Sequence, residues 1–341
     1  MTHFNIDLRS DTITTPTKEM LEYMFNAKVG DDVWEEDVTV KDLENYLASL
    51  FSKEAALFCP SGTMTNQIAI RVHAKMGDEL ICDRLAHIYN YEGGGIASNS
   101  GVSVRLLDGE FGRISLDQIK GNINPDDVHF PRTRLVCLEN TVNKGGGVCY
   151  DYRSIQSISN YCRQNNLMLH LDGARIFNAL IARSESSYDY GKLFDSISVC
   201  LSKGLGAPIG SVLIGGSDFI KQAKRVRKSL GGGMRQVGYL AAAGKYALEH
   251  HVHRLADDHS RARLIGEQLS QLHYVINLRP IETNIVLFDV KEEYINRFKK
   301  LLNDHLIQGS FMGDCTVRFV TSLAFCDNQL DSVLKALKTL S

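Results

Sequence analysis

The sequence has no surplus of basic residues, no long apolar run and no closely spaced cysteine pair. Its 38 lysines and arginines are balanced by 40 acidic residues, and the net charge of −2 provides no basic surface for nucleic acid or an anionic membrane. No apolar stretch reaches the roughly 20 residues that a membrane-spanning helix needs. The first residues lack the charged, apolar and small-residue order of a secretory signal. We therefore expect a cytoplasmic protein with no nucleic-acid or membrane partner.

The eight cysteines occur singly, which argues against zinc sites and disulfides. Several lie within apolar, strand-like runs, so we predict buried free thiols in a reducing compartment. His250, His251 and His253 form a local cluster, but they occupy a polar helical stretch. We interpret them as a solvated helix face, and we predict no metal site.

Short apolar runs alternate with helical patterns through the first two-thirds of the chain. The 341 residues can bury a large core. We predict strands at residues 55–58, 79–82, 102–107, 135–139, 167–171, 196–201 and 211–214, and helices at residues 16–28, 39–51, 62–74 and 151–165. This alternation is typical of an α/β fold in which a mainly parallel sheet is covered by helices on both faces.

The pattern changes twice towards the C-terminus. Residues 221–271 are almost wholly helical, and from residue 272 the order becomes strand, helix, strand, helix. We therefore predict three parts: an N-terminal segment (residues 1–30), a large domain (31–271) and a small C-terminal α/β domain (272–341).

Asp172 and Lys203 each follow a predicted strand, and ligands of parallel sheets gather at the carboxyl ends of strands. An acidic residue followed by a lysine in this layout suits pyridoxal 5′-phosphate. The cofactor's aldehyde needs a lysine amine, and its ring nitrogen needs a carboxylate that keeps it protonated. An ordinary solvated lysine is the alternative, so the neighbouring motifs decide between the two.

Ser61, Gly62 and Thr63 lie between a predicted strand and a helix. Amides and hydroxyls at a helix N-terminus suit a phosphate group, although Ser-Gly-Thr is also an ordinary turn and helix cap. His87 follows the next strand and could stack on a cofactor ring or move protons beside it, or be a plain loop histidine.

Three arginines are candidates for binding anionic groups. Arg175 follows Asp172 by three positions and could reach a cofactor oxygen or a substrate carboxylate. Arg318 lies within a predicted strand, where it is either a carboxylate clamp or an edge residue facing water. Arg235 follows three glycines at residues 231–233, and could point at a phosphate in a neighbouring subunit.

Together these motifs resemble the L-threonine aldolases, which are pyridoxal-phosphate enzymes of the aspartate-aminotransferase-like fold type I. The resemblance runs nearly the whole chain and is carried by Asp7–Thr12, Val29–Val33, Pro60–Met64, Leu138–Thr141, His170–Arg175, Ser198–Gly206 and Gly231–Gln236. It implies that residues 1–30 contribute to the active site and that residues 31–271 form the domain that binds pyridoxal phosphate. It also implies a homotetramer with active sites shared between subunits.

The resemblance also implies a role for each candidate residue. Lys203 would form the Schiff base with the cofactor, Asp172 would hold the ring nitrogen and His87 would stack on the ring. The phosphate would be held by Ser61, Gly62, Thr63 and, from a neighbouring subunit, Arg235. The cofactor oxygen would contact Arg175, and the substrate carboxylate would contact Arg175, Ser10 and Arg318.

The chain departs from the family pattern at two positions of interest. Val142 stands where the family usually has a histidine that contacts the substrate hydroxyl, and Trp34 stands where a tyrosine is usual. An isopropyl group near the substrate cannot take a proton, so we expect His87 to take over that task. On this basis we also expect relaxed specificity for the β-substituent.

The resemblance implies a carbon–carbon lyase that cleaves L-threonine or L-allo-threonine to glycine and an aldehyde. An alternative keeps the cofactor but changes the reaction to β-elimination, racemisation or transamination. A second alternative is a non-catalytic cofactor-binding protein, which Val142 alone supports. The products formed from β-hydroxy-α-amino acids would separate these hypotheses.

Overall fold

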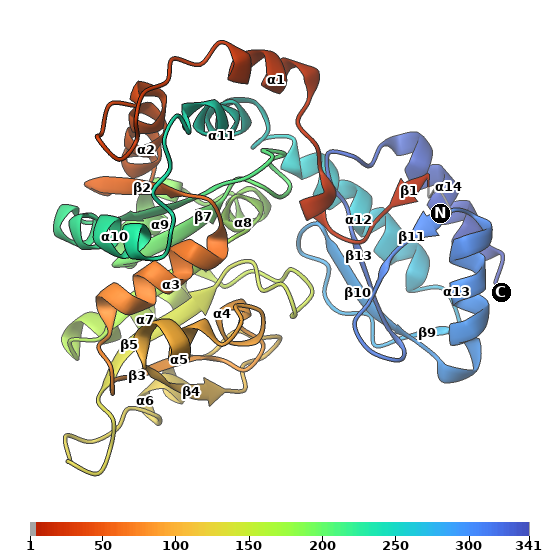
Figure 1. Cartoon of the computed structure of the whole chain (residues 1–341). Helices are drawn as coiled ribbons and strands as arrows, with labels where there is room; N and C mark the ends of the chain where they lie inside the picture. The colour runs from red at the N-terminus through yellow and green to blue at the C-terminus, as the bar shows by residue number, and fades with distance from the viewer. Residues whose placement is uncertain (1–4, 341) are drawn as a thin grey trace.

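The computed structural model describes residues 5–340, which form a large and a small unit side by side (Figure 1). The large unit is built on a seven-stranded sheet, and the small unit on a four-stranded sheet with a separate two-stranded pair. This architecture confirms the predicted α/β fold with a mainly parallel, helix-covered sheet. Within residues 5–340, no helix has the length and apolarity to cross a membrane.

The large sheet has the strand order β2-β8-β7-β6-β5-β3-β4, and only β8 runs against its neighbours. Its strands are β2 (Ala55–Cys59), β3 (Glu79–Asp83), β4 (Ser103–Leu107), β5 (Thr133–Glu139), β6 (Met168–Gly173), β7 (Ser196–Cys200) and β8 (Ser211–Gly215). The carboxyl ends of β5, β6 and β7 therefore meet at one edge. There, Glu139 lies directly beside Asp172 in the register of β5 and β6.

Both faces of this sheet are buried, because alternate residues of each strand enter different cores. On β3, for example, Ile81 belongs to one core, whereas Leu80 and Cys82 belong to the other. The core containing Ile81 also takes residues from α1 (Lys18–Phe25), α2 (Val38–Leu50), α6 (Leu116–Lys120), α7 (Tyr152–Gln164), α8 (Ile176–Arg183), α9 (Ser187–Leu193) and α11 (Gly238–His250). The opposite face is covered by α3 (Gly62–His73), α4 (His87–Asn90), α5 (Gly95–Ser100) and α10 (Ser217–Ser229).

The small unit has an antiparallel sheet in the order β12-β13-β10-β9. Its strands and helices are β9 (Val275–Ile276), β10 (Ile285–Val290), β12 (Ser310–Phe311), β13 (Thr316–Val320), α12 (Leu255–Leu269), α13 (Ile295–Asp304) and α14 (Asp327–Lys338), with a short 3₁₀ turn at Glu292–Tyr294. Strand β1 (Ile6–Asp7) pairs in parallel with β11 (Ile307–Gln308). The boundary at residue 272 stays a prediction, since the core of this unit also takes residues from β1 and α12.

Most strands lie where the sequence predicts them, and six of the eight cysteines are buried free thiols, as expected. One local interpretation is wrong. His251 does not belong to a solvated face, because its ring is buried and its Nδ1 lies 2.7 Å from the carbonyl oxygen of Leu205. This contact holds the turn that follows Lys203.

On the edge strand β2, two side chains occupy the backbone N–H and C=O groups of Phe58, two residues before Pro60. The Phe58 amide donates to Glu44 Oε1 at 2.7 Å, and its carbonyl accepts from Arg227 Nη1 at 2.7 Å. Arg227 also forms a buried ion pair with Asp32 at 2.8 Å. These contacts fix the strand that leads into α3, since buried backbone groups need partners.

Burial raises the pKa of Glu44 to about 7, from an ordinary value of 4.5. Because the folded-state pKa exceeds the unfolded one, its contribution to stability is full below about pH 4.5 and is lost as the pH rises through about 7. Glu44→Gln keeps an acceptor for Phe58 but cannot ionise. We expect urea unfolding to show the variant gaining stability over the native protein across this pH range. The exposed change Glu22→Gln on α1 is the control; a pH-independent difference for Glu44→Gln would contradict the argument.

Candidate functional site

A cavity of about 710 Å³ lies at the carboxyl edge of the large sheet and reaches the small unit. Nine of the ten predicted site residues line it: Ser10, Ser61, Gly62, Thr63, His87, Asp172, Arg175, Lys203 and Arg318. The tenth, Arg235, does not. The cavity also includes residues to which the sequence patterns assign no role, among them Asn66, Tyr91, Glu139, Asn143 and Cys200.

The N-terminus of α3 opens onto this cavity. Ser61 caps the helix, with its Oγ accepting from the Met64 amide at 3.2 Å, and the first helical bond runs from Thr65 N to Ser61 O. The amides of Gly62 and Thr63 precede that bond and so remain available to an anion. Glycine is required at position 62, because a Cβ there would lie 2.6 Å from Cys200 Sγ.

Asp172 is buried at the end of β6 and receives hydrogen bonds at both carboxylate oxygens. Asn66 Nδ2 donates to Oδ2 at 2.9 Å, and the Ala174 amide donates to Oδ1 at 3.1 Å. Each oxygen of the Asp172 carboxylate therefore acts as a hydrogen-bond acceptor. Asp172 is therefore suited to hold a protonated nitrogen in the cavity.

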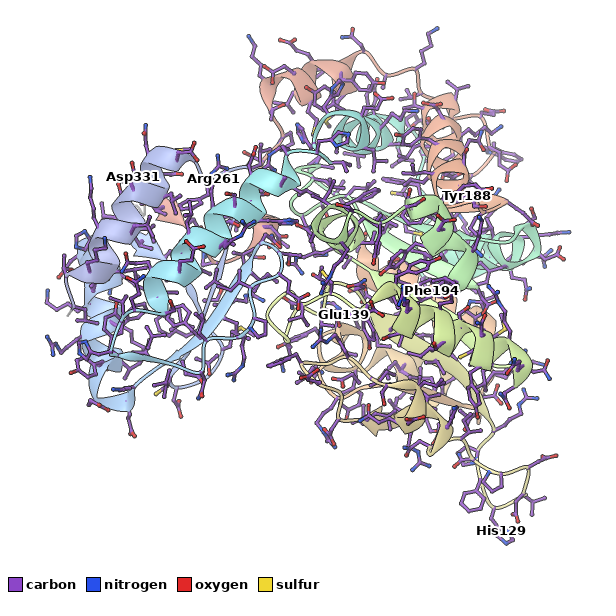
Figure 2. All side chains as sticks on the ribbon, turned by 180° about the vertical axis from the view of Figure 1, so that it is seen from behind. His129, Glu139, Tyr188, Phe194, Arg261 and Asp331 are labelled. Carbon is purple, nitrogen blue, oxygen red and sulfur yellow. The ribbon has the colours of Figure 1, made fainter. Side chains whose placement is uncertain are left out.

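Glu139 fixes the backbone at His87, the first residue of α4. Its Oε2 accepts from the His87 amide at 2.8 Å, and its Oε1 accepts from the Asn143 amide at 2.8 Å. Glu139 lies on the side of the large unit that faces the small one (Figure 2). Burial, and then the charge of Asp172, raise the pKa of Glu139 to about 7.

The His87 ring contacts a second buried carboxylate, with Nδ1 lying 3.0 Å from Glu92 Oε1. Burial by itself lowers the pKa of His87, but the Glu92 bond and the charges of Asp172, Glu92 and Glu139 raise it above its ordinary value. Because Nδ1 is occupied by Glu92, Nε2 is the nitrogen left to exchange a proton in the cavity.

His87, Glu92 and Asp172 each present a ligand atom within 4.8 Å of the other two, which is close enough to surround a metal ion. The space between the two carboxylates is already bridged, however. Asn66 Nδ2 donates to Glu92 Oε1 at 2.8 Å and to Asp172 Oδ2 at 2.9 Å. An amide nitrogen therefore satisfies the oxygens that a cation would require.

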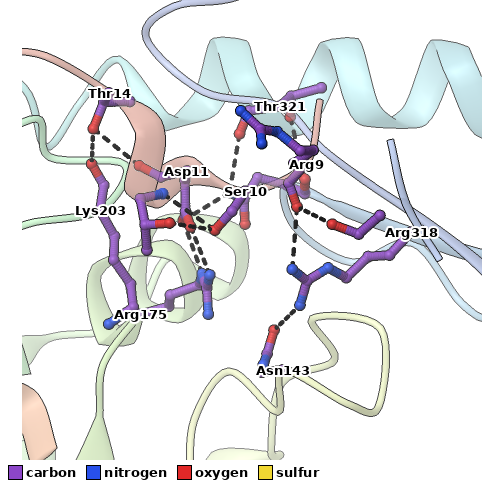
Figure 3. Close-up of polar contacts among 12 residues, drawn as sticks. Arg9, Ser10, Asp11, Thr14, Asn143, Arg175, Lys203, Arg318 and Thr321 are labelled. Carbon is purple, nitrogen blue, oxygen red and sulfur yellow. Dashed lines mark hydrogen bonds and ion pairs between the residues drawn. The ribbon is translucent and has the colours of Figure 1, made fainter. Parts of the chain in front are cut away.

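Arg175 reaches the cavity, but much of its guanidinium is bound by Asp11 (Figure 3). Nε donates to Asp11 Oδ2 at 2.8 Å, and Nη2 donates to Oδ1 at 2.6 Å, with both side chains buried. Burial would raise the pKa of Asp11, but the charge and hydrogen bonds of Arg175 and the charge of Lys203 hold it below its usual value. Asp11 thus fixes the orientation of Arg175.

The same N-terminal segment also contacts the backbone of Lys203. Thr14 Oγ1 donates to the Lys203 carbonyl at 2.8 Å (Figure 3). On the far side of the turn, the carbonyl of Leu205 faces His251. These contacts fix the lysine backbone from both sides and leave its side chain in the cavity.

Arg318 enters the cavity from β13 of the small unit. Its Nη1 donates to Asn143 Oδ1 at 3.0 Å and its Nη2 donates to the Arg9 carbonyl at 3.1 Å (Figure 3). Its buried Nε has no hydrogen-bond partner among the described residues. Burial, followed by the charge of Arg175, lowers the pKa of Arg318. An anionic ligand in the cavity would offset the neighbouring positive charges of Arg175 and Arg318.

Arg235 lies on the surface, where its Nη1 pairs with Asp31 Oδ2 at 2.8 Å. Trp34, in the loop beside Asp31, is 73% exposed. Neither Arg235 nor Trp34 lines the cavity of its own chain.

The expectation that Val142 meets the substrate is wrong. Its side chain is 1% exposed and belongs to the large core. It packs so closely that a Cβ added to Gly112 would lie 2.6 Å from Val142 Cγ1. The next residue, Asn143, lines the cavity instead and bonds Arg318. The identity of residue 142 therefore gives no reason to expect relaxed specificity.

The chain is similar to known enzymes over nearly its whole length. The family described as beta-eliminating lyase matches residues 7–293. The low specificity L-threonine aldolase of Escherichia coli (strain K12) is 43% identical over 96% of this chain and 97% of its own. Low-specificity L-threonine aldolase 1 of Arabidopsis thaliana is 44% identical over 84% of this chain and 82% of its own. The solved structure of Leishmania major threonine aldolase has a TM-score of 0.86 at 22% identity, covering 98% of this chain and 99% of that one, and so shares the fold.

The Asp11–Arg175 pair gives a direct stability prediction. Asp11→Asn leaves a buried guanidinium without its counter-charge, and breaking a buried pair on one side typically costs about 3–5 kcal/mol. We expect chemical denaturation to show a loss of that size. Asp7→Asn, which breaks the more exposed pair with Arg9, should cost less than about 1 kcal/mol. Similar losses of unfolding free energy in the two variants would show that the buried pair contributes no more to stability than the exposed one.

Proposed function

The chain belongs to the low-specificity L-threonine aldolases of the beta-eliminating lyase family, and from this premise we propose that it cleaves L-threonine and L-allo-threonine. The products are glycine and an aldehyde, released by breaking the Cα–Cβ bond of the β-hydroxy-α-amino acid. The observation that carries the proposal is one cavity that joins Lys203, the buried Asp172 and the open N-terminus of α3.

We propose pyridoxal 5′-phosphate as the cofactor, and the donor set fits it. Ser61 and the amides of Gly62 and Thr63 would hold the phosphate. Asp172, a buried carboxylate with hydrogen-bond donors on both oxygens, would hold the ring nitrogen, and His87 would lie against the ring. When bound, the cofactor supplies an aldehyde that takes up an amine and a ring that accepts the electron pair of the broken bond.

The cavity residues orient the amino acid. We propose that Arg318 binds its α-carboxylate, with Ser10 beside it and Arg175 held by Asp11. Lys203 would hold the cofactor through its side-chain amine. His87 Nε2 takes the proton of the β-hydroxyl as the bond breaks, because its Nδ1 is held by Glu92.

The experiment that tests the reaction is product analysis with L-threonine, L-allo-threonine and phenylserine. Equal amounts of glycine and aldehyde are expected. The family description favours a second candidate, β-elimination on the same cofactor, which would instead give ammonia and a keto acid. Those products without glycine would replace the aldolase proposal. The non-catalytic alternative loses its support, because Val142 lies in the core.

We further propose a cytoplasmic homotetramer whose active sites are shared between subunits. The exposed Arg235 and Trp34, which lie outside the cavity of their own chain, support a role for both in a neighbouring site. Arg235 would there reach the phosphate. Six buried free thiols support a reducing compartment.

Lys203→Ala should lose nearly all turnover, because no other lysine lines the described cavity. Reduction of the native protein with borohydride should leave the pyridoxyl group on the peptide that contains Lys203, as seen by mass spectrometry. The exposed Lys75→Ala is the matched control and should behave as the native protein. An active Lys203→Ala protein, or a label on another lysine, would end the proposed role.

Shared sites can be tested by mixing two inactive variants. Lys203→Ala and Arg235→Ala subunits should regain activity when exchanged, because a mixed pair contains one site with both native residues. Exchange of Lys203→Ala with the double variant gives no intact site and serves as the control. If subunit exchange is demonstrated by mass and the first mixture stays inactive, Arg235 does not act across a subunit boundary.

A further inference from the structure

A row of buried polar side chains runs from Asp172 and Asn66, which line the cavity, into the interior of the large unit. Asp172 accepts from Asn66 Nδ2 at 2.9 Å, and Asn66 Oδ1 lies 3.1 Å from His170 Nε2. His170 Nδ1 lies 2.8 Å from Ser196 Oγ, which lies 2.7 Å from His73 Nε2. All five side chains are buried, in α3, β6 and β7. A fully connected polar row of this kind is costly to build unless every member is satisfied.

The orientation of the Asn66 side-chain amide decides which atoms of the row donate and which accept. Its Nδ2 faces two carboxylates, Asp172 and Glu92, so the amide group must be oriented with its NH₂ towards them. The amide oxygen then faces His170, and His170 Nε2 must carry the hydrogen. The reverse orientation of the amide would place an oxygen against two acidic groups.

The positions of the remaining hydrogens follow from the neutrality of the His170 and His73 rings. Burial lowers the pKa of His170 to about 4 and that of His73 to about 3, so each ring carries a single N–H. With its hydrogen on Nε2, His170 offers Nδ1 as an acceptor, and Ser196 donates to it. Ser196 Oγ in turn accepts from His73 Nε2. Every bond in the row therefore points towards Asp172.

We propose that Asn66, His170 and Ser196 are positioning residues that keep Asp172 an acceptor only, so that the shared proton stays on the nitrogen opposite it. The proposal rests on the proposed function, since that nitrogen belongs to the cofactor ring. Asn66 has a second task. Through Glu92 it is joined to His87 Nδ1, so one amide sets the position of both the carboxylate and the imidazole that flank the ring.

Removing Asn66 takes one hydrogen-bond donor away from Asp172, and the shared proton should then move from the ring nitrogen towards the carboxylate. This shift can be read directly in holoenzyme rebuilt with pyridoxal phosphate labelled with ¹⁵N in the ring. In Asn66→Ala the nitrogen resonance should move towards its unprotonated position, and kcat for threonine should fall about 10- to 100-fold, as is typical when a group that orients a reacting residue is lost.

The matched control is Asn178→Ala. Asn178 is also buried and also accepts from a histidine, with its Oδ1 lying 2.9 Å from His259 Nε2, but it lies outside the cavity. This variant should lose stability without moving the ring-nitrogen resonance. An equal shift in both variants would mean that the effect is only structural, and would overturn the proposal.

A second pair of variants tests the row without touching Asn66. Glutamine at position 170 can place an amide donor where His170 Nε2 stands, whereas asparagine reaches only the Nδ1 position. His170→Gln should therefore keep the native resonance and His170→Asn should lose it. The reverse order, or no difference between them, would contradict the direction assigned to the row.

The histidines can also be observed without cofactor. In ¹⁵N-labelled native protein near neutral pH, His73 and His170 should both be neutral with the hydrogen on Nε2. A cationic ring or a hydrogen on Nδ1 of His170 would refute the proposed row. Failure of the proposed function can be told apart from failure of the row. In that case the native protein would bind no pyridoxal phosphate, but the hydrogen positions on the two histidines would be as assigned.

Discussion

The buried ion pair of Asp11 and Arg175 is the contact on which the arrangement of the two units depends. Asp11 also accepts from Asn284 Nδ2 of the small unit at 3.3 Å, so a single carboxylate touches both sides of the cavity. Its segment begins in β1, which pairs with β11, and the Leu8 carbonyl accepts from Val320 in the small unit. A charge that is buried this deeply must keep its partner, so the N-terminal segment cannot leave without exposing the site.

Much of the fold can be predicted because the large sheet is buried on both faces. Short apolar runs such as residues 135–139 and 196–201 are typical of strands covered by helices on both sides, and their ends are predicted to within about two residues. Strand direction is harder to predict. The reversal of β8 depends on the connection formed by residues 201–210, and the two-residue strands β9, β11 and β12 are too short to leave a periodic pattern.

The residues of the site, like the strands, can be predicted only in part from the sequence. Residues whose side chains carry recognisable chemistry, such as Lys203 and Asp172, can be proposed from their place after strands, and the cavity brings them together. The roles of Asp11 and Asn66 cannot be predicted in this way, because their importance comes from partners far along the chain. The expectation for Val142 fails for the opposite reason: position in a motif does not say which way a side chain points, and here it points into the core.

The side chains that close β2 have a consequence for assembly. An open outer strand offers its backbone to a strand of another molecule and invites uncontrolled fibre-like growth. At Phe58 both backbone groups are already occupied by Glu44 and Arg227, which leaves no free pairing there. Backbone pairing between copies of this chain is therefore blocked at Phe58, by the same two side chains that fix the strand leading into α3.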